Sequence, residues 1–463
     1  MKIISNEEKK NFSNFIPLLN PLKDFELPFY TQDIFSKDQE IILKGAIHRI
    51  RNLPNVSFII LRLDRSCVQL VVEEEDLQKL NITSFQEGDF VKVKGLKREA
   101  NLKDRSIFPQ NIEIRVLEIS LIHRPKETPP FEINKKELNV KQDTEFDFRP
   151  ISLRHPKKRA IFKIAEAIAN SFSIYLTSLG FTRIHTPKIV FAGAEGGTNI
   201  FKLPYFDKEV FLAQSPQFYK QYGVVIFGRV YEIAPVFRAE KHNTSRHLNE
   251  YISLDLEMGY IDSFEDIIQV EIGFLKFLYD YYLPTFYKFE IDLLEIKLPK
   301  TENFVSLTIK EIHDIFYNET KKDYRNEPDL SPDEERFIYE WALKNHDTEF
   351  VFATHFPTIK RPFYTMETKD NKEVTESFDL LFRGLEVTTG SQRIHDYDMQ
   401  VEKLIRFGLK PEDFESYLQM HKYGIPPHGG LAIGLERLTA KTCGLENVKE
   451  ASMYPRDINR VTP

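Results

Sequence analysis

Polar and apolar side chains alternate along residues 252–260, which read Ile-Ser-Leu-Asp-Leu-Glu-Met-Gly-Tyr. Side chains switch faces at every residue of a β-strand, so Ser253, Asp255 and Glu257 share one face and the apolar side chains share the other. A strand of this kind has to pair with a neighbour and cover its apolar face, which restricts the chain around it to a sheet with one charged side.

The residues just before this run predict its partner strand. Val236, Arg238 and Glu240 alternate in the same way, which places these side chains on one face. A polar loop joins the two strands of this antiparallel ribbon and carries Lys241, His242, Arg246 and His247. Fixed arginines beside a cationic loop suit a polyphosphate that carries a planar base. Taken alone, such a ribbon is most often a surface hairpin with a solvated charged face, so the rest of the chain decides between the two interpretations.

The size and composition of the chain limit its class. At 463 residues it is too long for one ordinary core, and two or three domains are expected. A formal net charge of −7 argues against a general nucleic-acid coat protein, although local basic faces stay open. The two cysteines, Cys67 and Cys443, fit neither a disulfide framework nor a zinc site. The polar N-terminus lacks a signal peptide, and no apolar run approaches membrane-spanning length, so a cytoplasmic protein without membrane contact is expected.

The first part of the chain has the pattern of a β-barrel. Short β-type runs separated by turn signals cover residues 41–50, 57–63, 67–72, 90–95 and 112–119. Five strands so closely spaced predict a small barrel of the oligonucleotide-binding type. Three side chains stand where a barrel face could meet a nucleotide base, namely Phe58, Gln69 and Glu113. We therefore expect four segments: an N-terminal extension (1–37), the barrel (38–122), a proline-bearing linker or hinge (123–155) and a second domain (156–463).

The second domain begins with a helix. Apolar residues recur at every third or fourth position over residues 157–179, which is the helical period. A glycine-rich loop at residues 191–198 carries one carboxylate, Glu195, and lacks the spacing of a Walker or Rossmann phosphate loop, which indicates a lid. Further on, Gln217 and Lys220 lie on one face of a predicted helix start.

A hairpin near the end of the chain predicts a metal site. Residues 378–387 form two strand patterns around a turn at residues 383–384, which places Asp379 and Glu386 on one face, diagonally across the strands. Neighbouring carboxylates repel each other unless a cation lies between them. A hard ion such as Mg²⁺ that bridges to phosphate is the natural occupant.

Four motifs follow one another along the chain: Gln214-Ser-Pro-Gln with Lys220, Phe237-Arg-Ala-Glu with Arg246-His-Leu, Gly390-Ser-Gln-Arg-Ile-His, and Gly434-Leu-Glu-Arg-Leu. Together they resemble the class II aminoacyl-tRNA synthetases, and most closely the aspartyl-tRNA synthetase family of the archaeal and eukaryotic type (class IIb). The resemblance implies an α+β fold in which an N-terminal barrel of the OB-fold type binds the anticodon. It also implies a catalytic domain with a mostly antiparallel sheet flanked by helices.

The resemblance further implies the reaction and its residues. The family forms an aminoacyl-adenylate from the amino acid and ATP and transfers it to the tRNA 3′ end, work that is mostly positioning and cancellation of negative charge. The expected catalytic residues are Arg238 and Arg437. The expected Mg²⁺ ligands are Asp379, Glu386 and Thr389. The expected ATP contacts are Arg238, Glu240, Arg246, His247, Leu248, Glu386, Gly434, Leu435, Glu436 and Arg437. The expected L-aspartate contacts are Glu195, Gln217, Lys220, Arg238, Tyr364, Thr389, Arg393 and His428.

Two features of this expected site concern charge and direction. Lys220 and Arg393 are expected to pair with the β-carboxylate of aspartate. Thr389 stands where the family usually has serine, which keeps a hydroxyl. Strict alternation points it away from Glu386, so a bend near Gly390 is expected to bring the two together.

The resemblance also implies binding partners, and it leaves alternative functions open. The expected partner is tRNA-Asp, with tRNA-Asn open as a second, and Phe58, Gln69 and Glu113 match positions that contact the anticodon. Pro187 and the helix before it resemble a dimer-forming motif, so a homodimer is expected. The alternatives are an asparaginyl-tRNA synthetase, which shares both domains, a catalytically inactive tRNA-binding paralogue, and an amide-forming synthetase, which would normally lack the barrel.

Overall fold

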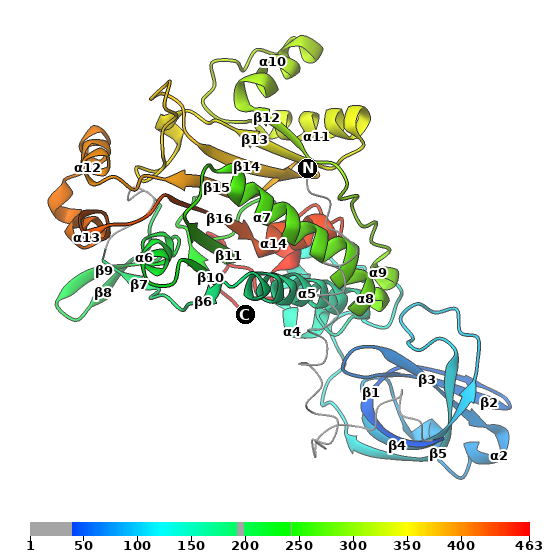
Figure 1. The fold of residues 1–463 in the computed structure, drawn as a ribbon. Coiled ribbons are helices and arrows are strands. Elements are labelled where there is room, and N and C mark those ends of the chain that lie inside the picture. Colours follow the sequence, from blue (N-terminus) through cyan, green and yellow to red (C-terminus); the bar gives the residue numbers. More distant parts are fainter. Residues whose placement is uncertain (1–38, 192–198, 242) are drawn as a thin grey trace. The chain divides into compact units, whose positions relative to one another are not determined.

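The computed structural model of the protein divides the chain into two units, Met1–Pro130 and Phe131–Pro463. Figure 1 draws the first unit in blue and cyan and the second from teal to red. The predicted N-terminal extension lies outside the described residues, which are 39–191, 199–241 and 243–463.

The first unit is a closed barrel with the strand order β1-β2-β3-β5-β4. Its strands are β1 (Glu40–Leu53), β2 (Val56–Arg62), β3 (Cys67–Glu73), β4 (Phe90–Glu99) and β5 (Ile112–His123), with the short helices α2 (Glu74–Leu77) and η2 (Ile82–Ser84) between β3 and β4. Aliphatic side chains such as Ile59 and Val93 fill the interior with no exposed surface. A Cβ at Gly95 would lie 2.4 Å from Ile114 Cγ2, so glycine allows β4 and β5 to approach closely. The predicted five-stranded barrel is confirmed.

The second unit is built on an eight-stranded sheet with the order β12-β13-β14-β15-β16-β11-β10-β6. The outermost pairs, β12–β13 and β10–β6, are parallel, and the pairs between them are antiparallel. The strands are β6 (Thr182–Arg183), β10 (Arg229–Phe237), β11 (Glu250–Gly259), β12 (Val305–Thr308), β13 (Phe350–Thr354), β14 (Ser377–Phe382), β15 (Leu385–Arg393) and β16 (His428–Gly434). A small second sheet, β7-β9-β8, contains β7 (Ile189–Val190), β8 (Lys202–Tyr205) and β9 (Lys208–Leu212).

Helices flank the large sheet (Figure 1). They are α3 (Gln142–Asp147), α4 (Arg149–Ser152), α5 (Pro156–Ser178), α6 (Gln217–Phe227), α7 (Glu265–Lys276), η3 (Phe277–Tyr282), α8 (Leu283–Phe286), α9 (Lys288–Leu294), α10 (Ile309–Thr320), α11 (Pro332–His346), η4 (Thr358–Lys360), α12 (Tyr397–Arg406), η5 (Pro411–Phe414), α13 (Glu415–Tyr423), α14 (Leu435–Thr442) and η6 (Val448–Ala451). Helix α7 covers one face, because Thr388 of β15 donates a 2.5 Å hydrogen bond to Glu271 of α7. Thr389 alternates to the opposite face, which is the face that carries the site. The predicted α+β fold with a mostly antiparallel sheet is confirmed.

The segment predicted as a linker differs from the structure. Strand β5 continues to His123, and residues 142–152 form α3 and α4 in the second unit. Arg149 has no exposed surface, and its guanidinium donates to the backbone carbonyls of Met453, Glu450 and Ser452 at 2.8–3.0 Å. The end of the predicted hinge is therefore docked in the second unit. Its helices are too short to show a helical period, and contacts far along the chain hold them.

Candidate active site

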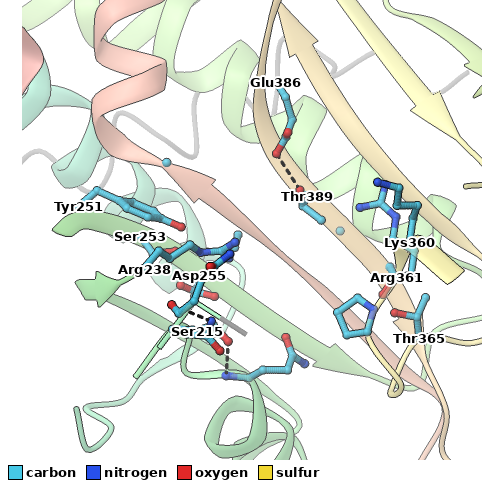
Figure 2. A pocket seen from close by; sticks show the side chains of 18 of the residues that line it. Ser215, Arg238, Tyr251, Ser253, Asp255, Lys360, Arg361, Thr365, Glu386 and Thr389 are labelled. Atoms are coloured by element: carbon cyan, nitrogen blue, oxygen red, sulfur yellow. Dashed lines mark hydrogen bonds between the residues drawn. The ribbon is translucent and has the colours of Figure 1, made fainter. Parts of the chain in front are cut away.

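A cavity of about 640 Å³ opens on the face of the large sheet that carries Thr389. Its walls come from β11, β15, β16, the start of α6, the loop after β10 and residues 359–365. Figure 2 shows Arg238 and Asp255 on one side of this cavity and Arg361 on the other, near Thr389.

The loop after β10 brings Arg238 into the cavity. Strand β10 ends at Phe237, so the prediction that Arg238 and Glu240 lie on the strand is wrong. Asn249 shapes the loop instead, because its side-chain amide donates to the carbonyls of Arg238 at 2.6 Å and Glu240 at 2.9 Å. Both residues nevertheless line the cavity. His242, from the same predicted loop, lies outside the described residues.

The charged face of β11 is buried, unlike that of a surface hairpin. Asp255 and Glu257 are 1% and 0% exposed. Lys220 Nζ of α6 lies 2.9 Å from Asp255 Oδ1 and 3.4 Å from Glu257 Oε2. Arg393 of β15 takes the other side of Glu257, with Nε 2.9 Å from Oε1 and Nη2 3.3 Å from Oε2. The four side chains form a row of alternating charge, in which Lys220, Asp255 and Arg393 line the cavity.

This row holds its charges away from water. Burial opposes ionisation of Glu257, yet Arg393 and Lys220 hold the pKa of this carboxyl below its ordinary value. The ring of Tyr364 lies 5.2 Å from the Arg393 guanidinium and lines the cavity beside it. Lys220 and Arg393 are 2% and 5% exposed. Each of these cations already lies beside a carboxylate, so the four buried charges of the row balance one another.

A β-bulge places Glu386 and Thr389 on the same face. In the hairpin β14–β15, Asp379 pairs with Thr389, but the register shifts between this pair and the turn, so Val387 is an extra residue. Thr389 Oγ1 consequently donates a 3.0 Å hydrogen bond to Glu386 Oε1. The bend was expected near Gly390, and that position is wrong, because the shift occurs at Val387.

Asp379, Glu386 and Thr389 offer oxygen atoms of the kind that Mg²⁺ prefers. Burial, reinforced by the nearby Glu386, raises the pKa of Asp379 to about 7, although Arg361 lies 2.9 Å from its carboxylate. Asp379 Oδ1 is buried without a hydrogen-bond partner, so an oxygen is free for a hard cation. Among the described residues no group of three His, Cys, Asp or Glu side chains could hold a metal ion. A site of this kind suits an ion that also takes phosphate oxygens as ligands.

Cations surround Glu386. Burial opposes its ionisation, but Arg437 and Arg361 hold the pKa of Glu386 below its ordinary value. Arg437 Nη1 donates to the backbone carbonyl of Glu386 at 3.0 Å and lies 3.4 Å from Oε1. Arg246 forms an ion pair with Glu335, whose Oε2 also accepts the backbone N–H of Glu386 at 3.2 Å. This end of the cavity therefore holds several arginines, which suit phosphate oxygens, each placed by a carboxylate or a backbone carbonyl.

Most of the predicted site residues come together in this cavity. Those that line it are Gln217, Lys220, Arg238, Glu240, Arg246, His247, Leu248, Tyr364, Glu386, Thr389, Arg393, Gly434, Glu436 and Arg437. Glu436 serves the fold as well, because its carboxylate oxygens accept the backbone N–H of Ile252 at 3.1 and 3.2 Å, and burial raises its pKa to about 8.

Four predicted residues are placed differently. Asp379 is buried at the edge of the site, where it pairs with Arg361, and is not part of the cavity lining. His428 has no exposed surface, and its ring nitrogens contact Gln221 Nε2 at 2.8 Å and the Pro426 carbonyl at 2.9 Å, so it supports the wall from behind. Leu435 starts α14 and is not part of the cavity lining. Glu195 lies outside the described residues.

Several residues of the site and its supports were not predicted, among them Asp255, Glu257, Glu335 and Arg361. The alternation of β11 had placed Asp255 and Glu257 on its charged face, and that was the available signal. Glu335 and Arg361 lie in segments without a strand or metal-ligand pattern that points to the site, so only the fold brings them there.

On the first unit, the residues expected to contact bases lie together. Strands β3 and β5 pair in parallel, and Gln69 Nε2 donates a 3.0 Å hydrogen bond to Glu113 Oε2. Phe58 of β2 pairs with Val71 of β3, which has the same face as Gln69, so all three predicted side chains share one face of the barrel.

A family model for class II tRNA synthetases (D, K and N) matches residues 141–458, which contain the whole cavity. The chain belongs to the class II tRNA synthetases. It is therefore an enzyme that uses ATP as a substrate, in keeping with the cationic end of the cavity. None of the helices in the described part of the synthetase has the length and apolar content to cross a membrane.

Relatives and solved structures cover nearly all of the synthetase. It is 43% identical over 426 residues to the aspartate–tRNA(Asp/Asn) ligase of Thermus thermophilus, covering 92% of this chain and 97% of that one. It is 40% identical over 431 residues to the ligase of the same name from Deinococcus radiodurans, with coverage of 92% and 96%. The asparaginyl-tRNA synthetase of Pyrococcus horikoshii complexed with asparaginyl-adenylate has a TM-score of 0.82, 28% identity and coverage of 92% and 96%. The aspartyl tRNA synthetase of Entamoeba histolytica has a TM-score of 0.79, 28% identity and coverage of 92% and 90%.

Proposed function

We propose that this synthetase ligates L-aspartate to tRNA-Asp in two steps, ATP-dependent formation of aspartyl-adenylate and transfer to the tRNA 3′ end. The observation that carries the proposal is the pair of buried cations, Lys220 and Arg393, in the same cavity as Arg238. Asp255 and Glu257 already balance the two cations, and a side-chain carboxylate offers them two acceptor oxygens where a neutral amide offers one. The names of the relatives at 43% and 40% identity support the same substrate.

The cavity offers an opposite charge to each charge of free aspartate. The planar guanidinium of Arg393 and the ammonium of Lys220 suit the β-carboxylate, as a two-pronged donor and a point charge. Asp255, with Gln217 nearby, suits the α-ammonium group. Arg238 then takes the α-carboxylate and leaves it directed toward the nucleotide.

Adenylate formation needs placement more than proton transfer. The attacking α-carboxylate is already ionised, and it forms a bond to the α-phosphorus of ATP as the bond to pyrophosphate breaks. Arg238 offsets the repulsion between the two anions, Arg246 and Arg437 hold the departing phosphates, and Glu240 lies toward the adenine. Mg²⁺ held by Asp379, Glu386 and Thr389 would offset further phosphate charge.

The barrel is the part that reads the tRNA. Phe58 suits stacking on an anticodon base, and Gln69 with Glu113 suits hydrogen bonding to a base edge. The relatives named aspartate–tRNA(Asp/Asn) ligase support tRNA-Asn as a second acceptor, and we include it in the proposal.

The alternatives explain less of the cavity. An asparaginyl-tRNA synthetase would bind a neutral amide, which offers Lys220 and Arg393 one acceptor oxygen where a carboxylate offers two. A catalytically inactive paralogue has no need for Arg238, Glu386 and Arg437, which line one cavity here.

ATP–pyrophosphate exchange tests the proposal. We expect exchange that depends on aspartate and on Mg²⁺, with asparagine giving only the background measured without amino acid. If asparagine supports exchange and aspartate does not, the assignment of Lys220 and Arg393 is wrong. Charging purified tRNA-Asp and tRNA-Asn side by side then tests the second acceptor.

We also propose that the synthetase acts as a homodimer in the cytoplasm. Leu179, Ile226 and Phe227, at the ends of α5 and α6, are 38%, 68% and 52% exposed, which supports an interface there. Cys67 and Cys443 are free thiols, as expected in a reducing compartment. Light scattering that gives the mass of one chain would contradict the dimer.

A further inference from the structure

Glu335 stands at the phosphate end of the cavity, between two residues to which the proposed function gives roles toward ATP. It belongs to the first turn of α11 and is 6% exposed. One of its carboxylate oxygens, Oε2, meets both Arg246 Nη2 and the backbone N–H of Glu386, the latter at 3.2 Å. A single buried oxygen therefore connects the loop after β10 with strand β15.

The start of α11 is anchored, so the position of Glu335 does not depend on its two contacts. Ser331 caps the helix and forms a capping box with Glu334. Glu334 Oε1 also lies 2.6 Å from His313 Nδ1 of α10. The backbone N–H of Glu335 donates to the carbonyl of Ser331 at 3.0 Å. Helices α10 and α11 thus present the carboxylate from a fixed frame.

The contacts of Glu335 complete the fixation of Glu386. The backbone N–H of Glu386 donates to Glu335, and its carbonyl accepts from Arg437 at 3.0 Å. The side chain of Glu386 accepts from Thr389 at 3.0 Å. On the other side, Arg246 uses one edge of its guanidinium for Glu335, which leaves further donors for a phosphate. Without this anchor, ATP itself would have to order a long, flexible side chain.

We propose that Glu335 is a positioning residue that sets both Arg246 and Glu386 for the phosphates of ATP. The inference rests on the proposed function, because the roles of Arg246 and Glu386 do. Glu335 touches neither substrate in this scheme and acts through its two neighbours. Its removal should therefore weaken the use of ATP and leave the aspartate end, at Lys220 and Arg393, nearly unchanged.

Three variants test this role. Glu335→Ala removes the anchor, and Glu335→Gln keeps an oxygen acceptor of the same reach but loses the charge. Asp333→Asn is the matched control, because Asp333 lies in the same helical turn, has a side chain that is 46% exposed, and pairs with Arg336 and Lys322. For each variant the measurements are the KM for ATP and for aspartate in pyrophosphate exchange, the affinity for Mg·ATP by calorimetry without amino acid, and the thermal midpoint.

We expect Glu335→Ala to raise the KM and Kd for ATP roughly 10- to 100-fold, as loss of a hydrogen bond to a charged group does. The KM for aspartate should change by less than about threefold. Glu335→Gln should give a smaller rise in the same direction, and Asp333→Asn none. If Glu335→Ala does not fold, Glu335→Gln alone decides, and it must raise the KM for ATP more than that for aspartate.

Other outcomes overturn the inference. Equal losses for both substrates would mean that Glu335 only stabilises the fold, and a lower KM for ATP would mean that it competes with phosphate for Arg246. An unchanged affinity for Mg·ATP in Glu335→Ala would also refute the role. If the wild-type synthetase binds Mg·ATP but supports no aspartate-dependent exchange, the proposed function fails, while the calorimetric comparison still tests Glu335.

Discussion

Glu271 should make the stability of the second unit depend on pH, and Glu271→Gln should remove this dependence. Glu271 lies on α7 behind the sheet and is 1% exposed. Its Oε1 accepts a 2.5 Å hydrogen bond from Thr388, and its Oε2 is buried without a hydrogen-bond partner. Burial raises the pKa of this carboxyl to about 8, from an ordinary value of 4.5.

The sign and the size follow from this pKa. The folded protein keeps a proton that the unfolded chain releases near pH 4.5, so the stabilising effect is complete below that pH and disappears as the pH rises to about 8. At about 1.36 kcal/mol for each pH unit, the difference between the folded and unfolded pKa of Glu271 corresponds to roughly 5 kcal/mol of unfolding free energy. Glutamine resembles the protonated acid and does not titrate. The variant should lie within about 1 kcal/mol of the wild type at pH 5 and be more stable by up to about 5 kcal/mol at pH 9.

Urea unfolding of both proteins at several pH values between 5 and 9 measures this difference. Glu265→Gln is the control, because Glu265 lies in the first turn of the same helix and is exposed. Pyrophosphate exchange at pH 7 should survive Glu271→Gln, since the glutamate carries its proton at that pH. If the unfolding midpoints of wild type and variant change in parallel with pH, Glu271 is ionised in the folded protein and the reasoning is refuted.

Three further predictions concern the synthetase reaction. Arg238→Ala should abolish pyrophosphate exchange while tRNA binding in a filter assay survives, and loss of both would indicate unfolding. Lys220→Met removes the cation shared by Asp255 and Glu257, so kcat/KM for aspartate should fall by a factor of about 30 or more, as expected for roughly 2–5 kcal/mol, and a value near wild type would contradict the pairing. Gln69→Ala should raise the KM for tRNA in aminoacylation without changing pyrophosphate exchange, and an unchanged KM for tRNA would remove the residue from the anticodon face.

Sequence patterns were sufficient for elements with a clear period. The five barrel strands and the helix at residues 157–179 follow from alternation and from the helical repeat, because both reflect which side chains face a core. They failed where contacts distant in the chain decide the structure. Asn249 holds Arg238 and Glu240 in a loop, although their alternation continues that of β10. Helices α3 and α4 depend on the docking of Arg149.

The residues of the cavity also separate into those that local sequence patterns predicted and those that only distant contacts bring to the site. Lys220, Arg238 and Arg393 were expected in one site because motifs identify them, and all three line the cavity. Glu335 carries no motif, and its two contacts are 89 and 51 residues away in the chain. A periodic pattern describes the face of one element, whereas an ion pair between elements depends on how they are stacked.

The bulge at Val387 shows how a local conflict produces the arrangement that the site needs. The turn at residues 383–384, with φ values of 50° and 70°, fixes the pairing of Phe382 with Leu385. Farther along, Gly390 pairs with Phe378, whose ring lies where a Cβ would be, at 2.3 Å, so this pairing is fixed by glycine. The two registers differ by one residue, and Val387 absorbs the difference.

Glu386 and Thr389 therefore fall on one face, although their spacing of three residues contradicts strict alternation. The N–H of Glu386 points to Glu335 and its carbonyl accepts from Arg437, so the same residue also receives the two contacts that fix it at the phosphate end. Gly390 thus influences the site by fixing the pairing of β14 with β15, and the strand does not have to bend at Gly390 itself. A side chain there would meet the Phe378 ring, and we expect the altered register to displace Glu386, four residues away, as well.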